Sequence, residues 1–191
     1  MNPQEPIINP LSGEHIVIRR TAAQTGGLVL DWELTLAPGG RVPSSHAHPE
    51  QEEVFTVLAG RMRFRVGWRW LTAGPGQQVR IPRGTVHHFA NAGRSPARMA
   101  VESRPALEME ELLRTAAALA RAQQAAGRAL PRLSELALFM TDFRREVRAP
   151  FVPVRLTRLL MTTVARIAVA RGGDLRYWQL RPAPWTAARW Q

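Results

Sequence analysis

Residues 40–60 read GRVPSSHAHPEQEEVFTVLAG, a segment in which two histidines and a glutamate lie between two glycines. One residue separates His46 from His48, and side chains at positions i and i+2 of a β-strand point to the same face. Both imidazoles are therefore expected to aim at one point. Glu53 comes after a PEQE turn, at the start of the next predicted strand.

A second segment, residues 76–91, reads GQQVRIPRGTVHHFAN and contributes another histidine, His87. On a strand distant in the sequence, its imidazole could reach the point at which the first two converge. Pro82 and Gly84 favour a turn before His87, and Asn91 can fix that turn by hydrogen bonding. We interpret Pro82, Gly84 and Asn91 as structural residues.

The two segments belong to a longer region, residues 14–104, which consists of short apolar stretches separated by glycine and proline. The predicted strands cover residues 15–20, 28–36, 54–60, 61–66, 69–72, 77–82, 86–91 and 97–103. Gly67 and Trp68 would form a hairpin turn with glycine first, as a type II′ turn prefers. Many short strands at regular spacing predict a β-sandwich or barrel.

The pattern changes at Pro105, and we expect a β-barrel domain over residues 1–104 and a helical region over residues 105–191. The predicted helices cover residues 105–127, 131–150 and 154–171, each flanked by proline or glycine. The third helix is basic and amphipathic, which is compatible with a position on an anionic membrane surface. We favour packing of the helical region on the barrel or within a homodimer.

The net charge is +11, and all 26 basic residues are arginine. The arginines are dispersed, which indicates the codon usage of a GC-rich genome rather than a phosphate-binding face, so nucleic-acid binding is not favoured. The absence of cysteine excludes iron–sulfur clusters, thiol catalysis and cysteine-based zinc sites. The N-terminal sequence has no readable signal peptide and residues 151–170 are too charged to span a bilayer, so we expect a cytoplasmic protein.

In its two histidine-bearing segments the sequence resembles the cupin superfamily, in particular single-domain, quercetin-dioxygenase-like members of the cupin 2 type. Both cupin motifs match at all their positions, and the resemblance covers roughly residues 30–104. It implies a mainly β fold, the double-stranded β-helix or jelly-roll barrel, here followed by an α-helical region. It also implies a metal ion held by His46, His48, Glu53 and His87. Glu50 and Glu52 are alternative carboxylates, but the spacing to Gly60 favours Glu53.

Three neutral imidazoles and one carboxylate suit a divalent Fe, Mn, Ni, Co or Zn ion. Four protein ligands leave a coordination position open, as in catalytic rather than structural sites. The leading hypothesis is a metal-dependent dioxygenase or related oxidoreductase that acts with O2 on a small enolisable substrate. Glu53 would be the catalytic base. The alternatives are a metal-dependent isomerase or decarboxylase and a non-enzymatic small-molecule binding or sensor protein.

Five apolar side chains are candidates for the lining of a substrate pocket: Met62, Phe64, Phe89, Trp32 and Met99. The alternative is that they fill the barrel, as side chains usually do in a small one. His88 is expected on the opposite face from His87, and His15 is expected to be an ordinary strand residue. The aromatic segment GWRW, residues 67–70, is either a pocket lid or a hairpin packed on a partner.

Overall fold

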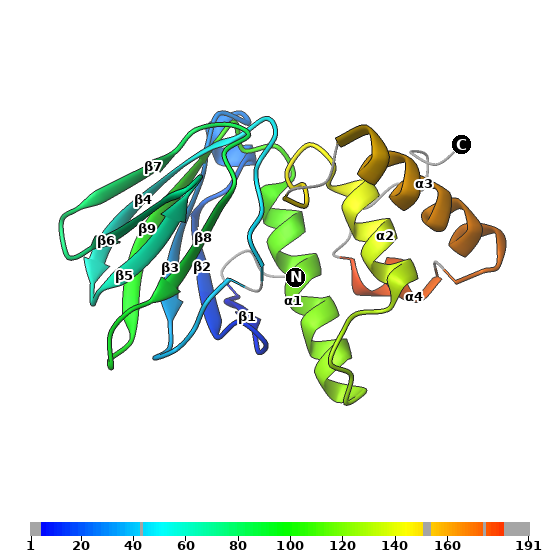
Figure 1. Cartoon of the computed structure of the whole chain (residues 1–191), viewed down its shortest axis with the longest axis horizontal. Coiled ribbons are helices and arrows are strands. Elements are labelled where there is room, and N and C mark those ends of the chain that lie inside the picture. The colour runs from blue at the N-terminus through cyan, green and yellow to red at the C-terminus, as the bar shows by residue number, and fades with distance from the viewer. Residues whose placement is uncertain (1–4, 43, 151–153, 174, 182–191) are drawn as a thin grey trace.

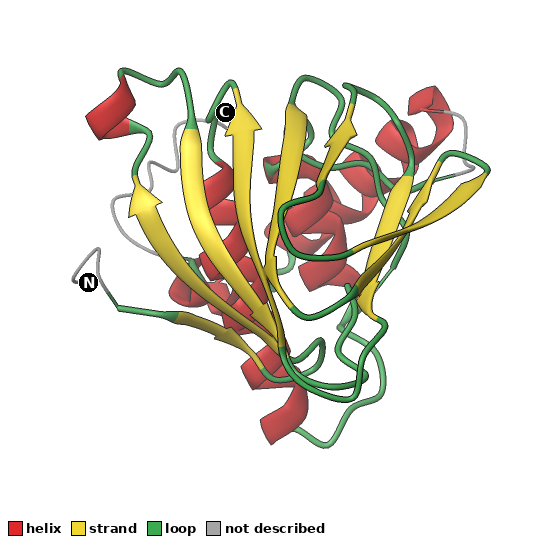
Figure 2. Cartoon of the chain, turned by 90° about the vertical axis from the view of Figure 1, so that its left-hand side faces the viewer, coloured by secondary structure: helices red, strands yellow, loops and turns green. Residues whose placement is uncertain are grey.

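The computed structural model describes residues 5–42, 44–150, 154–173 and 175–181. Two antiparallel sheets face each other, and a group of helices lies beside them (Figures 1 and 2). The larger sheet has the strand order β1-β2-β3-β9-β4-β7, and the smaller sheet has the order β6-β5-β8. The expected mainly β fold with a helical C-terminal region is confirmed.

The strands are β1 (Ile7–Asn9), β2 (Glu14–Arg20), β3 (Leu30–Leu36), β4 (Glu52–Ala59), β5 (Met62–Val66), β6 (Arg69–Ala73), β7 (Gln78–Ile81), β8 (His87–Asn91) and β9 (Ala97–Arg104). All but β1 overlap a predicted strand, because only β1 is too short to show an alternating pattern. Alternation places Phe55 of β4 and Phe64 of β5 between the sheets, where both are buried. These inward side chains form the core of the barrel.

Two glycines at turns have backbone conformations that other residues rarely adopt. Gly60, between β4 and β5, has a φ of 79°, and a Cβ there would lie 2.7 Å from Ala97 Cα. Only glycine lets the two chain segments approach so closely. Gly67 has a φ of 59°, the positive value that a type II′ turn requires at its first central position.

The helices are α1 (Met109–Ala125), α2 (Leu133–Asp142), α3 (Val154–Ala170) and α4 (Leu175–Leu180). The prediction that the first helix starts at Pro105 is wrong. Leu107 has a φ of 46°, which no right-handed helix accommodates. In addition, the backbone N–H of Ala106 donates to the carbonyl of Gly27 at 3.0 Å, so this stretch is tied to the barrel before the helix begins.

The predicted extent of the second helix, residues 131–150, is also wrong, because α2 ends at Asp142. Beyond it the chain returns to the barrel and pairs with Ala47. The N–H of Arg148 donates to the Ala47 carbonyl at 2.9 Å, and the N–H of Ala47 donates to the Arg148 carbonyl at 3.2 Å. This tertiary pairing overrides the helical propensity of the sequence. The six-residue helix α4 was not predicted at all.

The helix α1 lies between the barrel and the other helices (Figure 1). Met109 and Leu112 on α1 belong to the apolar core of the barrel, and Arg121 donates to the carbonyl of Ile8 in β1 at 3.0 Å. A second apolar cluster in the helical region includes Leu138, Ala165, Tyr177 and Trp178. Among the described helices, none combines the length and apolarity needed to traverse a bilayer.

A buried ionic network fixes the end of α4 to the rest of the helical region. Arg181 Nη1 lies 2.8 Å from Asp142 Oδ2, and Arg181 Nη2 lies 3.1 Å from Glu108 Oε2. Only 7% of the Arg181 side chain and 1% of the Asp142 side chain are exposed, so water screens this pair weakly. Tyr177 donates its hydroxyl to the same Asp142 oxygen at 3.0 Å. The network joins three segments that are distant in the sequence.

Replacement of Arg181 by alanine is expected to lower the free energy of unfolding by about 3 kcal/mol, because it removes the countercharge of a buried carboxylate. Urea denaturation followed by circular dichroism measures the change. Arg19→Ala is the control, since Arg19 pairs with Glu33 at the surface and should cost less than about 1 kcal/mol. Equal losses in the two variants would contradict the role given to Arg181.

Candidate metal centre

Three histidine side chains converge inside the barrel. His46, His48 and His87 each offer a ring nitrogen, and these atoms lie within 4.8 Å of one another. The rings of His46 and His87 are 4.4 Å apart between centroids, because the two residues form an antiparallel bridge. The N–H of His87 donates to the His46 carbonyl at 2.8 Å, and the return bond measures 3.1 Å. Such a group of imidazoles can hold a metal ion.

Glu53 lies beside two of these imidazoles. Its Oε2 atom is 3.1 Å from His48 Nε2 and 3.3 Å from His87 Nε2. The other two glutamates of the segment face the surface: Glu50 is paired with Arg145 and Glu52 with Arg80. Glu53 is therefore the carboxylate of the three that the structure brings to the histidines.

Two of the histidines are oriented by carbonyl oxygens two residues earlier in the chain. His46 Nδ1 lies 3.0 Å from the Ser44 carbonyl, and His87 Nδ1 lies 3.1 Å from the Thr85 carbonyl. A carbonyl only accepts hydrogen bonds, so each Nδ1 must carry the proton. Each Nε2 is then left with a free lone pair, which is the form in which imidazole binds a metal.

The third histidine is oriented from the helical region. His48 Nδ1 lies 2.5 Å from the carbonyl oxygen of Glu146, which follows α2. Close to this contact, the backbones of Ala47 and Arg148 pair in an antiparallel β-bridge. The sequence reasoning placed residues 46–48 on a strand, whereas the structure holds them by single bridges to two different segments. A residue outside the β domain thus orients one of the candidate ligands.

Burial and mutual charge set the protonation of the group. Burial, together with the neighbouring His87 and His48, lowers the pKa of His46 to about 3. Burial alone would raise the pKa of Glu53, but the charge and hydrogen bond of His48 hold it well below its ordinary value. For His48, burial opposes the charged form, yet Glu53 raises its pKa. Glu53 is therefore a carboxylate and His46 a neutral imidazole.

His87 Nε2 shows that the residues present fit a metal ion. This atom is buried and makes no hydrogen bond with any residue of the described segments, although Glu53 Oε2 is 3.3 Å away. A buried polar atom without a partner costs free energy. A divalent cation bound by the three Nε2 lone pairs would remove that cost.

The five apolar candidates for a pocket lining are all buried in the barrel core: Met62, Phe64, Phe89, Trp32 and Met99. Phe55 was not among the candidates, yet its ring centroid lies 6.4 Å from that of His87 and 5.3 Å from that of Phe89. Its position two residues after Glu53 on one strand could have revealed it. The aromatic core thus extends to the edge of the histidine group.

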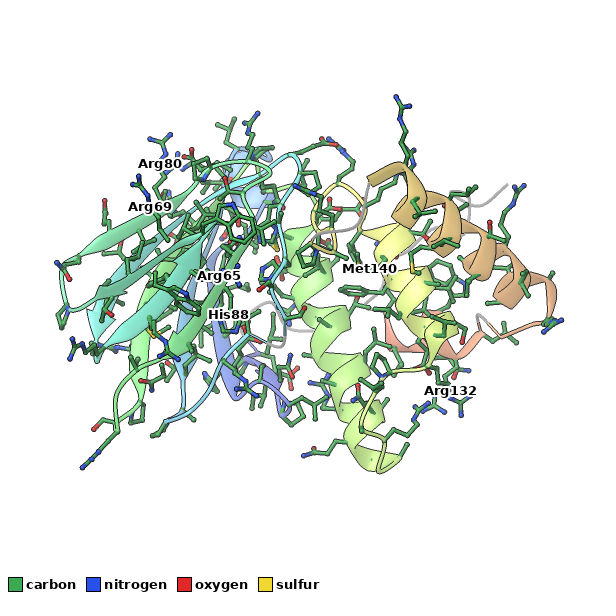
Figure 3. All side chains as sticks on the ribbon, viewed as in Figure 1. Arg65, Arg69, Arg80, His88, Arg132 and Met140 are labelled. Atoms are coloured by element: carbon green, nitrogen blue, oxygen red, sulfur yellow. The ribbon has the colours of Figure 1, made fainter. Side chains whose placement is uncertain are left out.

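The remaining aromatic and histidine candidates lie away from this site. His15 is exposed on β2, and His88 faces outward beside Arg65, its partner across β8 and β5 (Figure 3). Trp68 and Trp70 of the GWRW segment are 82% and 58% exposed. They therefore do not cover the histidines in this chain.

Ser103 is a residue of the site that the sequence reasoning missed. It lies opposite Glu53 in the pairing of β4 with β9, and its hydroxyl donates to Glu53 Oε1 at 3.0 Å. Ser103 is fully buried. It holds one carboxylate oxygen so that the other faces the imidazoles. Only the strand register, which the sequence does not specify, reveals this contact.

Residues 32–102 match the family model described as cupin domain, and no curated protein matches the sequence. Among solved structures, the chain is similar to protein Ylba from E. coli, with 18% identity, a TM-score of 0.45, and coverage of 49% of this chain and 38% of that one. A sugar phosphate isomerase of the cupin superfamily from Silicibacter pomeroyi is 23% identical, with a TM-score of 0.43, and the match covers 48% of this chain and 59% of that one. A predicted oxalate decarboxylase from Thermotoga maritima is 19% identical, with a TM-score of 0.48, and the match covers 53% of this chain and 90% of that one. The chain thus spans less than two thirds of the length of the first two proteins.

Replacement of Ser103 by alanine is expected to weaken divalent metal binding about tenfold, because the Glu53 carboxylate loses the hydrogen bond that orients it. Titration of the metal-free protein with Co²⁺ in competition with a chelator measures the affinity. Ser12→Ala is the matched control, since Ser12 donates a comparable bond to Glu14, which is not one of the proposed ligands. Unchanged affinity in Ser103→Ala, or an equal loss in both variants, would argue against this role.

Proposed function

We propose that this protein binds a divalent transition metal and uses it as a dioxygenase or related oxidoreductase on a small enolisable substrate. The proposed ligands are His46, His48, His87 and Glu53. The observation that supports the proposal best is the orientation of the imidazoles, whose Nδ1 atoms all face carbonyl oxygens while their ring nitrogens converge. Histidines that only filled the core of the barrel would not require this common orientation.

The donor set indicates the class of metal. Three imidazole nitrogens and one carboxylate oxygen suit Fe, Mn, Co, Ni or Zn, whereas Mg and Ca prefer oxygen ligands alone. These metals commonly take five or six ligands, so four from the protein leave room for a substrate oxygen. The site therefore fits a catalytic ion better than a structural one.

Glu53 is the proposed base. Its carboxylate is ionised, since the charge and hydrogen bond of His48 outweigh the effect of burial on its pKa. A base with so low a pKa can take a proton only from an acidified group, as the hydroxyl of an enol or an α-hydroxy-ketone would be if a metal ion bound its oxygen. A bound ion would act as a Lewis acid toward the resulting oxyanion. The rings of Phe55 and Phe89 would keep water from that anion.

A second candidate function is a non-enzymatic sensor. It is favoured by the contact of the Glu146 carbonyl with His48, because metal or ligand binding at His48 would act directly on the segment that joins α2 to α3. A sensor would bind metal and ligand without turnover. This function and the oxidoreductase differ in their chemistry and not in the proposed ligands.

The purified protein is expected to contain close to one equivalent of Fe, Mn, Co, Ni or Zn by plasma mass spectrometry. The variant His46→Ala/His87→Ala should lose it, because two of the four donors are removed. His88→Ala is the matched control, since His88 is the neighbour of His87 but points away from the centre. Retention of metal in the double variant would refute the proposed ligand set.

Oxygen uptake with a panel of small enols and hydroxy-ketones tests the chemistry. Glu53→Gln keeps a ligand oxygen but removes the base, so it is expected to reduce oxygen uptake at least about 100-fold at saturating metal. Substrate turnover without oxygen uptake would indicate that the protein is an isomerase or decarboxylase rather than an oxidoreductase. Ligand binding without turnover would favour the sensor.

A further inference from the structure

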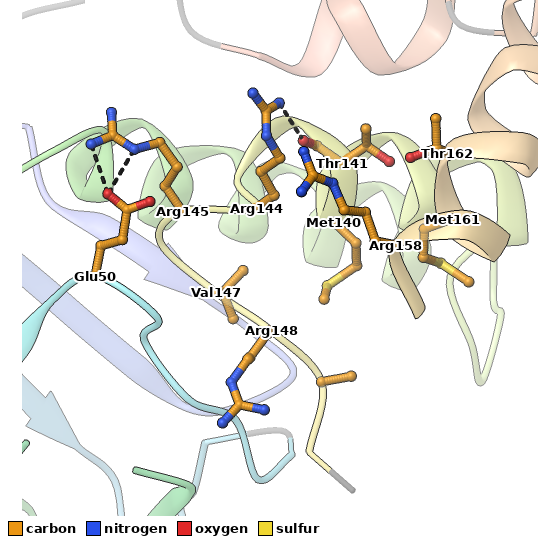
Figure 4. Close-up of a pocket in the computed structure, with 11 residues that line it drawn as sticks. Glu50, Met140, Thr141, Arg144, Arg145, Val147, Arg148, Arg158, Met161 and Thr162 are labelled. Carbon is orange, nitrogen blue, oxygen red and sulfur yellow. Dashed lines mark hydrogen bonds and ion pairs between the residues drawn. The ribbon is translucent and has the colours of Figure 1, made fainter. Parts of the chain in front are cut away.

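A cleft of about 310 Å³ lies on the helical side of the segment that orients His48. Its walls come from α2, from α3 and from residues 144–149, with Glu50 of the barrel at its edge (Figure 4). This volume is at the small end of the range for small-molecule pockets, about 300–1,000 Å³. None of the three histidines of the candidate metal centre is among the residues that line the cleft.

The cleft carries more positive charge than its own residues neutralise. Four arginines line it, against a single carboxylate on Glu50. That carboxylate is already bound by Arg145, whose Nε and Nη2 atoms donate to Glu50 Oε2 at 2.9 and 2.8 Å. The charges of the other three arginines are therefore left without an anion in the cleft: Arg144, Arg148 and Arg158.

The contacts of these three arginines confirm the imbalance. Arg148 donates to the carbonyl of Gly84 at 2.8 Å, and Arg144 donates to the carbonyl of Thr141 at 3.5 Å. Both acceptors are neutral, so they orient the guanidinium groups without cancelling their charge. Arg158, on α3, makes no ion pair within the residues that the structure describes. An anion in the cleft could pair with these guanidinium charges, which the cleft itself leaves without a carboxylate.

Apolar side chains form the rest of the wall. Met140 of α2, Met161 of α3 and Val147 of the connecting segment face the same cleft as the arginines (Figure 4). Methionine adapts its shape readily to an apolar ligand. The cleft therefore offers hydrogen-bond donors for a charged group and an apolar surface for a short hydrocarbon body.

We infer that this cleft binds a small organic oxyanion, a carboxylate or a phosphate ester, with its charged end on Arg144 and Arg158. Arg148 also lines the cleft, but its guanidinium points away from these two (Figure 4) and donates to the Gly84 carbonyl. The planar fork of a guanidinium matches both oxyanions in geometry and charge. The apolar body lies against Met140 and Met161. This site is distinct from the proposed metal centre and does not depend on the metal.

Isothermal titration of the metal-free protein at low salt tests the inference with three probes of equal chain length: hexanoate, hexyl phosphate and hexanol. At least one of the two anions is expected to bind, and hexanol is not. If only one anion binds, its head group identifies the oxyanion that the cleft prefers. Binding should weaken as salt is added, because the contact is between charges.

The variant Arg144→Gln/Arg158→Gln is expected to bind the anion at least about tenfold more weakly. Both side chains are exposed, so the substitutions should leave the thermal unfolding temperature unchanged. Arg166→Gln is the matched control, because Arg166 is exposed on the same helix but lies outside the cleft. It is eight residues from Arg158, about 12 Å along the helix axis.

Three results would overturn the inference. They are the absence of binding by either anion, equal binding of hexanol, and equal weakening in the Arg166→Gln control. Because every titration uses metal-free protein, a failure here leaves the proposed metal chemistry untouched. Conversely, a protein that binds no metal can still bind the anion.

Discussion

The hydrogen bonds between carbonyl oxygens and the three Nδ1 atoms are the constraint on which the site depends. Each acceptor fixes the tautomer of one imidazole and turns its Nε2 toward the common centre. Ser44 and Thr85 supply two acceptors from within the barrel, whereas Glu146 supplies the third from beyond α2. The barrel alone therefore orients only two of the three rings, and the helical region completes the arrangement.

Local patterns predicted most of the barrel and the candidate ligands. The alternation of inward and outward side chains placed eight of the strands, and the same period of two set His46 and His48 on one face. The choice of Glu53 over Glu50 and Glu52 rested on the resemblance to a known motif rather than on periodicity. The structure places only Glu53 beside the imidazoles. Phe55 shares this face by the same rule, and the period of two could have identified it.

Features that depend on contacts between distant segments were not accessible from the sequence. The end of α2 is set by the pairing of Arg148 with Ala47, about a hundred residues apart, and no local signal marks it. The register that brings Ser103 to Glu53 is equally non-local. The arginines of the cleft come from α3 and from the residues after α2, so they looked dispersed along the chain. Only the folded chain shows that they gather.

The pairing of Ala47 with Arg148 has a consequence for how this chain can change during evolution. The short stretch that carries two candidate ligands is held by β8 on one edge and by the helical region on the other. A barrel exchanged for another as a self-contained module would lose the partner of Ala47 and the acceptor of His48 together. Insertions are therefore better tolerated between α1 and α2 than between α2 and residue 148. The two halves are expected to diverge as one unit, with compensating substitutions across residues 46–48 and 146–148.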